Sequence, residues 1–115
     1  MNWTIWHNPR CRKSRETLAL LKANGIRPSV RLYLKDGPSE DEIRTVLVYL
    51  EKAPRDLLRL KEPLAKELGL RDCLAHSDKC VDAMASHPSL IERPVVIRDE
   101  RAVLGRPPEA VLALL

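Results

Sequence analysis

The stretch WTIWHNPRCRKSRETLALLKANG, residues 3–25, decides the fold of this chain. Residues 3–7 are rich in bulky β-forming side chains, which predict a strand. The Asn-Pro pair that follows predicts a turn that ends the strand. Ser14 is placed to cap a helix whose apolar residues recur at helical spacing, and the Asn-Gly pair at 24–25 ends it. The stretch therefore predicts a strand, a short loop and a helix.

The next apolar segment completes a βαβ unit. Residues 30–34 alternate as a second strand, and the Asp-Gly-Pro run at 36–38 turns the chain. A strand, a helix and a second strand in this order predict two parallel strands joined by a right-handed crossover.

A block of helices is expected after this unit. Ser39 and Glu42 have the spacing of a capping box, and four apolar residues follow at i, i+3, i+4 and i+7: Ile43, Val46, Leu47 and Leu50. Shorter helical pieces are predicted at 54–59, 63–68 and 77–86. None of these segments alternates as a strand does, so the block is read as a helical insertion.

The chain ends with two strands and a helix. Residues 93–98 predict a third strand, and a tight turn at 99–100 leads into a fourth at 102–104. Two prolines at 107–108 open a final helix that places Val111, Leu114 and Leu115 on one face. The order βαβ, helices, ββα belongs to the α/β class, and we expect one domain spanning residues 1–115.

Composition narrows the class of protein. No apolar run in the 115 residues approaches the ~20 needed to cross a bilayer, and the N-terminus lacks the pattern of a secretory signal. The three cysteines have neither C-x-x-C nor zinc-finger spacing, which argues against a disulfide framework and a structural metal. We expect a cytoplasmic protein with reduced thiols, no membrane contact, no metal and no bound cofactor.

The positive charge is concentrated at one place. The net charge is +4, and residues 1–15 hold four cations (Arg10, Arg12, Lys13 and Arg15) and no acid, so the remainder of the chain balances. Nucleic-acid-binding proteins usually spread their charge and interleave aromatics, which here make up 3% of residues. A compact patch suits a small anion better, and we expect no direct nucleic-acid contact.

Cys11 lies among these cations, between the predicted first strand and first helix. Backbone N–H groups and the helix dipole favour an anion there, and the cations favour thiolate over thiol. His7 and Ser14 are near enough in sequence to donate hydrogen bonds to the sulfur. The alternative, a buried and inert cysteine that begins a helix, fits the surrounding charge less well. Cys11 is therefore the candidate nucleophile.

Other candidates are weaker from the sequence alone. Cys73 and Cys80 could resolve a disulfide only if the fold brought one of them to Cys11, and inert thiols are the simpler interpretation. Arg93 and Arg106 precede prolines at the starts of predicted elements. A guanidinium suits a tetrahedral oxyanion, but spacing does not select particular arginines.

The segment from His7 to Leu18, HNPRCRKSRETL, closely resembles the active-site loop of the glutaredoxin-dependent arsenate reductase family. The resemblance extends in order over nearly the whole chain. Its further motifs are Tyr33-Leu34 with Pro38-Ser39, Leu57-Leu58-Arg59, His87-Pro88, Ile91-Glu92-Arg93-Pro94-Val95-Val96 and Gly105-Arg106-Pro107-Pro108-Glu109.

The resemblance implies a thioredoxin-like fold with a helical insertion between the second and third strands. It implies that the Cys11 thiolate attacks arsenate, that glutathione reduces the adduct and releases arsenite, and that glutaredoxin then restores the thiol. The family's oxyanion-binding arginines match Arg59, Arg93 and Arg106. His7 and Ser14 match positions associated with activating the cysteine.

Two departures keep alternatives open. Arg12 and Lys13 stand where well-characterised reductases of this type carry small residues, which could redirect the substrate. A glutathione-linked thiol reductase for another substrate is thus one alternative, and a redox-sensing regulator that binds RNA polymerase is another. Such regulators usually carry a second cysteine three residues after the first. The residue here is Ser14, which disfavours an internal disulfide switch.

Overall fold

The computed structural model describes residues 2–115, and of Cys73 it describes the backbone alone. The chain forms two compact units, which are described separately. Residues 2–36 and 93–115 make a sheet unit, and residues 37–92 make a helical unit inserted between the two segments. We predicted one domain together with a helical insertion, and the insertion is confirmed between the second and third strands.

The sheet unit is built on four strands in the order β2-β1-β3-β4. These are β1 (Trp3–Trp6), β2 (Ser29–Arg31), β3 (Val95–Arg98) and β4 (Arg101–Leu104). As predicted, β1 and β2 are parallel, and Trp6 pairs with Arg31. β1 and β3 are antiparallel, as are β3 and β4. The start of β3 therefore lies beside the end of β1.

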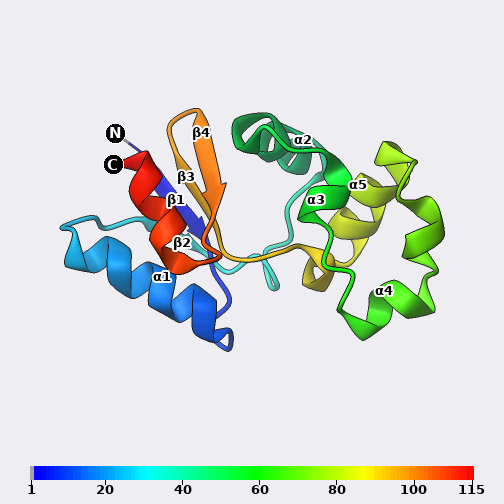
Figure 1. Ribbon diagram of the computed structural model, residues 1–115, viewed down its shortest axis with the longest axis horizontal. Helices are drawn as coiled ribbons and strands as arrows, with labels where there is room; N and C mark the ends of the chain where they lie inside the picture. Colours follow the sequence, from blue (N-terminus) through cyan, green and yellow to red (C-terminus); the bar gives the residue numbers. More distant parts are fainter. Residues whose placement is uncertain (1) are drawn as a thin grey trace. The chain divides into compact units, whose positions relative to one another are not determined.

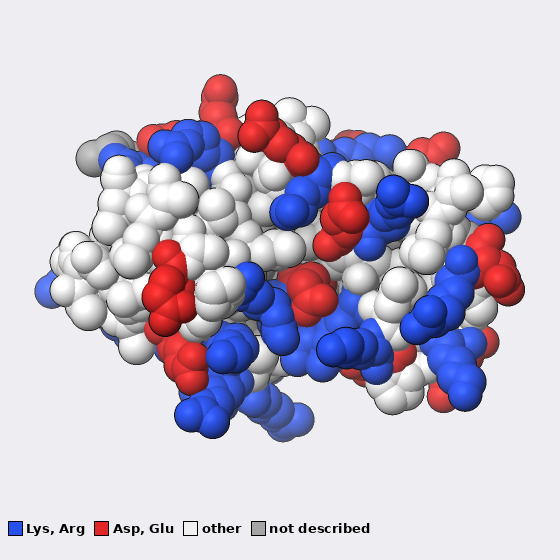
Figure 2. Space-filling view, viewed as in Figure 1, with Lys and Arg blue, Asp and Glu red and all other residues white. Residues whose placement is uncertain are grey.

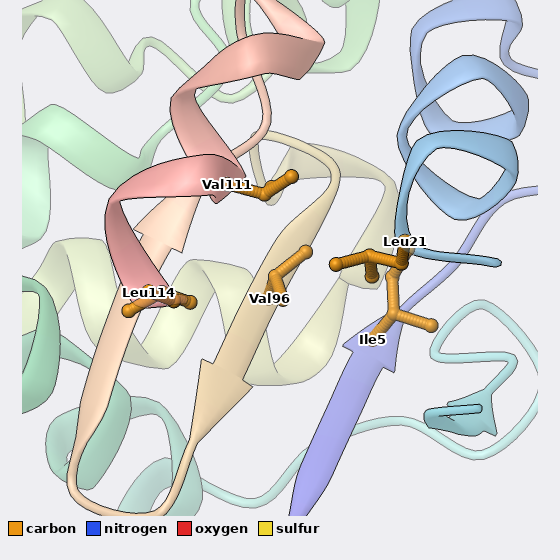
Figure 3. Packing of buried hydrophobic residues seen from close by; sticks show 5 residues of the cluster. All are labelled: Ile5, Leu21, Val96, Val111 and Leu114. Atoms are coloured by element: carbon orange, nitrogen blue, oxygen red, sulfur yellow. The ribbon is translucent and has the colours of Figure 1, made fainter. Parts of the chain in front are cut away.

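Helix α1 (Arg12–Ala23) and the 3-10 helix η3 (Pro108–Leu114) pack on one another in this unit (Figure 1). Apolar side chains from both helices and from two central strands form the core in Figure 3: Ile5, Leu21, Val96, Val111 and Leu114. The period-2 pattern of the strands explains the arrangement, because Ile5 and Val96 pair in register and face the same side. Leu115, which we expected on the buried face, is 55% exposed.

The boundaries of α1 correct one expectation. Ser14 does not cap the helix, because α1 begins two residues earlier and Cys11 is its N-cap residue, with an extended backbone. The end is as predicted, since Asn24 is the C-cap residue and Gly25 follows with φ of 76°. A positive φ favours glycine at this position.

The helical unit contains α2 (Glu40–Leu50), α3 (Pro54–Leu57), α4 (Pro63–Glu67) and α5 (Ser77–Ser86), with the short 3-10 helices η1 (Leu70–Cys73) and η2 (Pro88–Leu90). The capping box is confirmed, because the Ser39 and Glu42 side chains each accept a hydrogen bond from the other residue's backbone N–H. The four apolar residues predicted to line one face of α2 are all buried. Within residues 2–115, no helix has the length and apolarity needed to cross a membrane.

Gly105 joins two parts of the sheet unit, and its substitution should be costly. A Cβ at this position would lie 2.6 Å from Thr17 Oγ1 on α1 and 2.8 Å from Pro94 Cγ, both much too close. We expect Gly105→Ala to lower the free energy of unfolding by about 1–3 kcal/mol. Urea denaturation followed by circular dichroism measures this. Gly25→Asn is the control, because a Cβ added at Gly25 would have nothing within 4 Å and Asn tolerates a positive φ. Equal stability of both variants would contradict the close packing.

Candidate active site

The loop between β1 and α1 is held in one conformation by hydrogen bonds. The Cys11 N–H donates to the Asn8 carbonyl (3.0 Å), which closes a turn, and the Asn8 side chain accepts from the Arg10 N–H (3.0 Å). The Arg15 guanidinium donates to the Pro9 carbonyl (2.9 Å). Cys11 is thus fixed at the N-terminus of α1, where the helix's unpaired N–H groups lie.

The Cys11 side chain is 9% exposed, and its surroundings favour the thiolate. Burial raises the pKa of the thiol. The Ser14 N–H, the hydrogen bond and charge of the Arg93 guanidinium, and the Lys13 N–H lower that pKa further than burial raises it. Since the thiolate is the reactive form, the net effect prepares Cys11 for nucleophilic attack.

The side-chain charges of the four cations near Cys11 in sequence are not among the causes that lower its pKa. Arg12 and Lys13 are solvent-exposed, and both approach the Glu16 carboxylate, at 2.9 and 3.8 Å. Arg15 is occupied with the loop backbone. Figure 2 shows Lys and Arg atoms gathered near the N-terminal end of α1, so this surface is basic. The cation that acts on the sulfur, Arg93, comes from a segment 82 residues further along the chain.

His7 and Ser14 form a buried pair beneath the loop. His7 Nδ1 and Ser14 Oγ are 2.6 Å apart, and the Asn8 N–H also donates to Ser14 Oγ (3.0 Å). Burial, helped by the charges of Lys22 and Arg15, lowers the pKa of His7, so the ring is neutral at pH 7. The Ser14 hydroxyl therefore connects α1 to the loop. The Ser14 backbone N–H donates to the Cys11 sulfur and lowers its pKa.

Arg93 is positioned by the antiparallel pairing of β3 with β1. It lies two residues before β3, and Val95 at the start of β3 pairs with Trp6 at the end of β1. The Arg93–Pro94 peptide bond is cis, as is Arg106–Pro107. Arg93 Nε and Nη1 are buried without a hydrogen-bond partner in the described part of the chain. Buried cationic donors are costly unless an anion accepts from them, so these two atoms make the surroundings of Cys11 suited to an anion.

The other two predicted arginines lie in different places. Arg106 is in the sheet unit, exposed, and its Nη1 approaches the Arg93 carbonyl at 3.4 Å. Arg59 is in the helical unit, half-buried, and its Nη1 lies 2.6 Å from Glu62 Oε2. The structure thus brings Cys11, His7, Ser14, Arg93 and Arg106 into one unit.

The other two cysteines belong to the helical unit. Cys80 is completely buried within α5 of the helical unit. The Cys73 side chain lies outside the described residues. Among the residues that are described, no three His, Cys, Asp or Glu side chains gather as metal ligands would.

Comparisons with known proteins show which family the chain resembles. The sequence profile of the ArsC family matches residues 6–114. The chain is 46% identical over 112 residues to the uncharacterized protein YfgD of Escherichia coli, covering 96% of this chain and 94% of that protein. It is 42% identical over 116 residues to an arsenate reductase of Haemophilus influenzae, covering all of both chains.

A solved structure supports the fold as well as the family. The arsenate reductase from Vibrio cholerae superimposes with a TM-score of 0.96 at 48% identity, covering 100% of this chain and 98% of that one. The match confirms the predicted thioredoxin-like α/β fold. On the sequence match and the structural match, this chain belongs to the ArsC family.

Proposed function

We propose that this protein reduces arsenate to arsenite through the Cys11 thiolate, with glutathione and glutaredoxin supplying the electrons. The observation that carries the proposal is the buried Arg93 guanidinium. It donates to the sulfur of Cys11, whose pKa is lowered, and its Nε and Nη1 can each donate a hydrogen bond to a ligand. The relatives named arsenate reductase, which match the chain from end to end, support arsenate as that ligand.

The first step is nucleophilic attack on arsenic. The Cys11 thiolate forms an S–As bond, and an arsenate oxygen leaves as hydroxide or water. Arg93 holds the oxyanion by charge-assisted hydrogen bonds, so charge that develops on the oxygens is stabilised without rearrangement. Arg106, and Arg59 by the resemblance alone, are proposed to contribute further contacts to the oxyanion.

The second step is a two-electron reduction. The glutathione thiolate attacks the Cys11 sulfur, an S–S bond forms, and the S–As bond breaks with its electron pair on arsenic, which leaves as arsenite. Glutaredoxin then removes glutathione from Cys11 by thiol–disulfide exchange. An external reductant fits the location of Cys80, which is completely buried in the helical unit. The proposal includes no resident metal or cofactor and places the protein in the cytoplasm.

Turnover should require Cys11 and no other cysteine. We expect Cys11→Ser to lower arsenate-dependent NADPH consumption, coupled through glutathione, glutaredoxin and glutathione reductase, by at least about a thousandfold. A variant with Cys73→Ser and Cys80→Ala, in which Cys11 is the sole cysteine, should stay active. Full activity of Cys11→Ser would eliminate the nucleophile. Inactivity of a folded single-cysteine variant would mean that an internal thiol resolves the adduct.

The pH dependence of Cys11 alkylation should report the influence of Arg93. Because the pKa of Cys11 is lowered, the rate of reaction with iodoacetamide should rise with pH through a midpoint below the usual range of a thiol. Removing the guanidinium in Arg93→Gln raises that pKa, so the midpoint should move to higher pH. Arg27→Gln, which removes an exposed charge from the same unit, is the control. An unchanged midpoint in Arg93→Gln would contradict this contact.

Arg93 should also bind the substrate. We expect Arg93→Gln to lower kcat/KM for arsenate by about 10- to 100-fold, the equivalent of a charge-assisted hydrogen bond of ~1.5–3 kcal/mol. Arg93→Lys keeps the charge but loses the planar fork, and should recover part of the activity. Steady-state kinetics at a pH where Cys11 is ionised in every variant separates this effect from the shift in pKa. Unchanged kinetics would remove Arg93 from the oxyanion site.

A further inference from the structure

A cavity of about 390 Å³ lies on the active-site loop and has no role in the chemistry described above. Its lining comes from two short segments of the sheet unit, residues 7–10 after β1 and residues 32–35 after β2. We call it the loop pocket. Since β1 and β2 are parallel, both segments emerge at the same edge of the sheet, and the His7 N–H donates to the Arg31 carbonyl (2.8 Å) there.

Both walls of the loop pocket are hydrogen-bonded turns. One is the turn from Asn8 to Cys11 already described, and the other is closed by the Lys35 N–H, which donates to the Leu32 carbonyl (3.0 Å). Tyr33, 1% exposed, anchors the second turn in the protein. The pocket is therefore preformed, as sites for small molecules usually are.

The lining suits an organic anion. Arg10 and Lys35 are exposed cations, and in the described part of the chain no ion pair is recorded for either. Leu32, Leu34 and Pro9 supply apolar surface, and no carboxylate lines the cavity. The volume is within the ~300–1,000 Å³ usual for organic ligands. A five-atom inorganic oxyanion would leave most of it empty, which separates this pocket from the oxyanion site at Arg93.

The distance to Cys11 fits a tripeptide. Asn8 and Cys11 are the two ends of one turn, so their Cα atoms lie within ~7 Å of each other, and an extended tripeptide spans ~10 Å. A ligand of this length, held at the cations by its terminal carboxylates, is long enough to bring a thiol in its middle toward the neighbouring Cys11. Glutathione has this arrangement, with a thiol between two carboxylate-bearing ends.

We infer that the loop pocket is the binding site of the glutathione co-substrate, with Arg10 and Lys35 holding its carboxylates. The inference rests on the proposed function for the identity of the thiol. In the bound complex the thiolate sulfur attacks the Cys11 sulfur, the S–S bond forms, and the S–As electron pair leaves with arsenite. The pocket thus keeps the reductant and the oxyanion in separate places around one sulfur atom.

Binding can be tested without turnover. S-methylglutathione has no thiol and cannot react, so it is added to the reduced full-length protein while backbone amide NMR signals are recorded. Saturable shifts should concentrate at Arg10 and at residues 32–35, and should be lost in Arg10→Gln/Lys35→Gln but kept in Arg27→Gln. Shifts elsewhere, or shifts that survive the double substitution, would overturn the inference.

Kinetics gives the second test. We expect KM for glutathione to rise about two- to fivefold in Arg10→Gln and in Lys35→Gln, and about 5- to 20-fold in the double variant. KM for glutathione diethyl ester, which has no carboxylates, should change little. Iodoacetamide alkylation of Cys11 checks that the thiol itself is unaltered. An equal rise for glutathione and its ester would overturn the assignment of the carboxylates.

The two proposals can fail separately. Binding of S-methylglutathione in the loop pocket without arsenate turnover would keep the pocket and discard arsenate. Arsenate turnover with an unchanged KM for glutathione in the double variant would keep the reductase and discard the pocket.

Discussion

The contact between the Arg93 guanidinium and the Cys11 sulfur is the interaction on which the site depends. Burial alone would keep Cys11 protonated, because a thiolate loses solvation in an apolar environment. Arg93 and the N–H groups at the start of α1 reverse that preference. Two nitrogens of the same buried guanidinium have no hydrogen-bond partner among residues 2–115, which is unfavourable until an anion binds. The lowered pKa of Cys11 and the need of Arg93 for an anion therefore arise at one contact.

The fold provides this contact through strand pairing. β3 runs antiparallel to β1, so the residue before Pro94 is delivered to the end of β1, where the loop with Cys11 begins. Gly105 keeps the arrangement tight, since its N–H donates to the Pro94 carbonyl (2.9 Å) and its missing side chain lets Thr17 approach. Helix, loop and strand are thus fixed around one sulfur atom before any substrate binds.

Local patterns predicted most elements well and long-range contacts poorly. The second strand, expected over residues 30–34, is Ser29–Arg31, and the residues after it form a turn. The spacing of apolar residues predicted α2, and the Asn-Gly pair predicted the end of α1. Both predictions succeeded because each feature depends on residues only a few positions apart. Ser14 was wrongly placed as a cap because its hydroxyl has a partner, His7, across the loop. The positive charge that acts on Cys11 was expected from the four cations near it in sequence. Glu16 lies beside two of them, Arg12 and Lys13, and the charge of Arg93 acts on the sulfur instead. Arg93 was identified by the resemblance to a family, because its spacing in the sequence does not distinguish it from other arginines.

The insertion of 56 residues between the two segments of the sheet unit also affects how the protein is made. On a ribosome adding ~5–20 residues per second, Cys11 is synthesised several seconds before Arg93. Until β3 pairs with β1, the strongest side-chain influence that lowers the pKa of Cys11 is absent. The nascent chain therefore passes through synthesis with a less reactive cysteine. The pKa of Cys11 is fully lowered only when β3 pairs with β1, so the reactivity of this thiol depends on completion of the sheet.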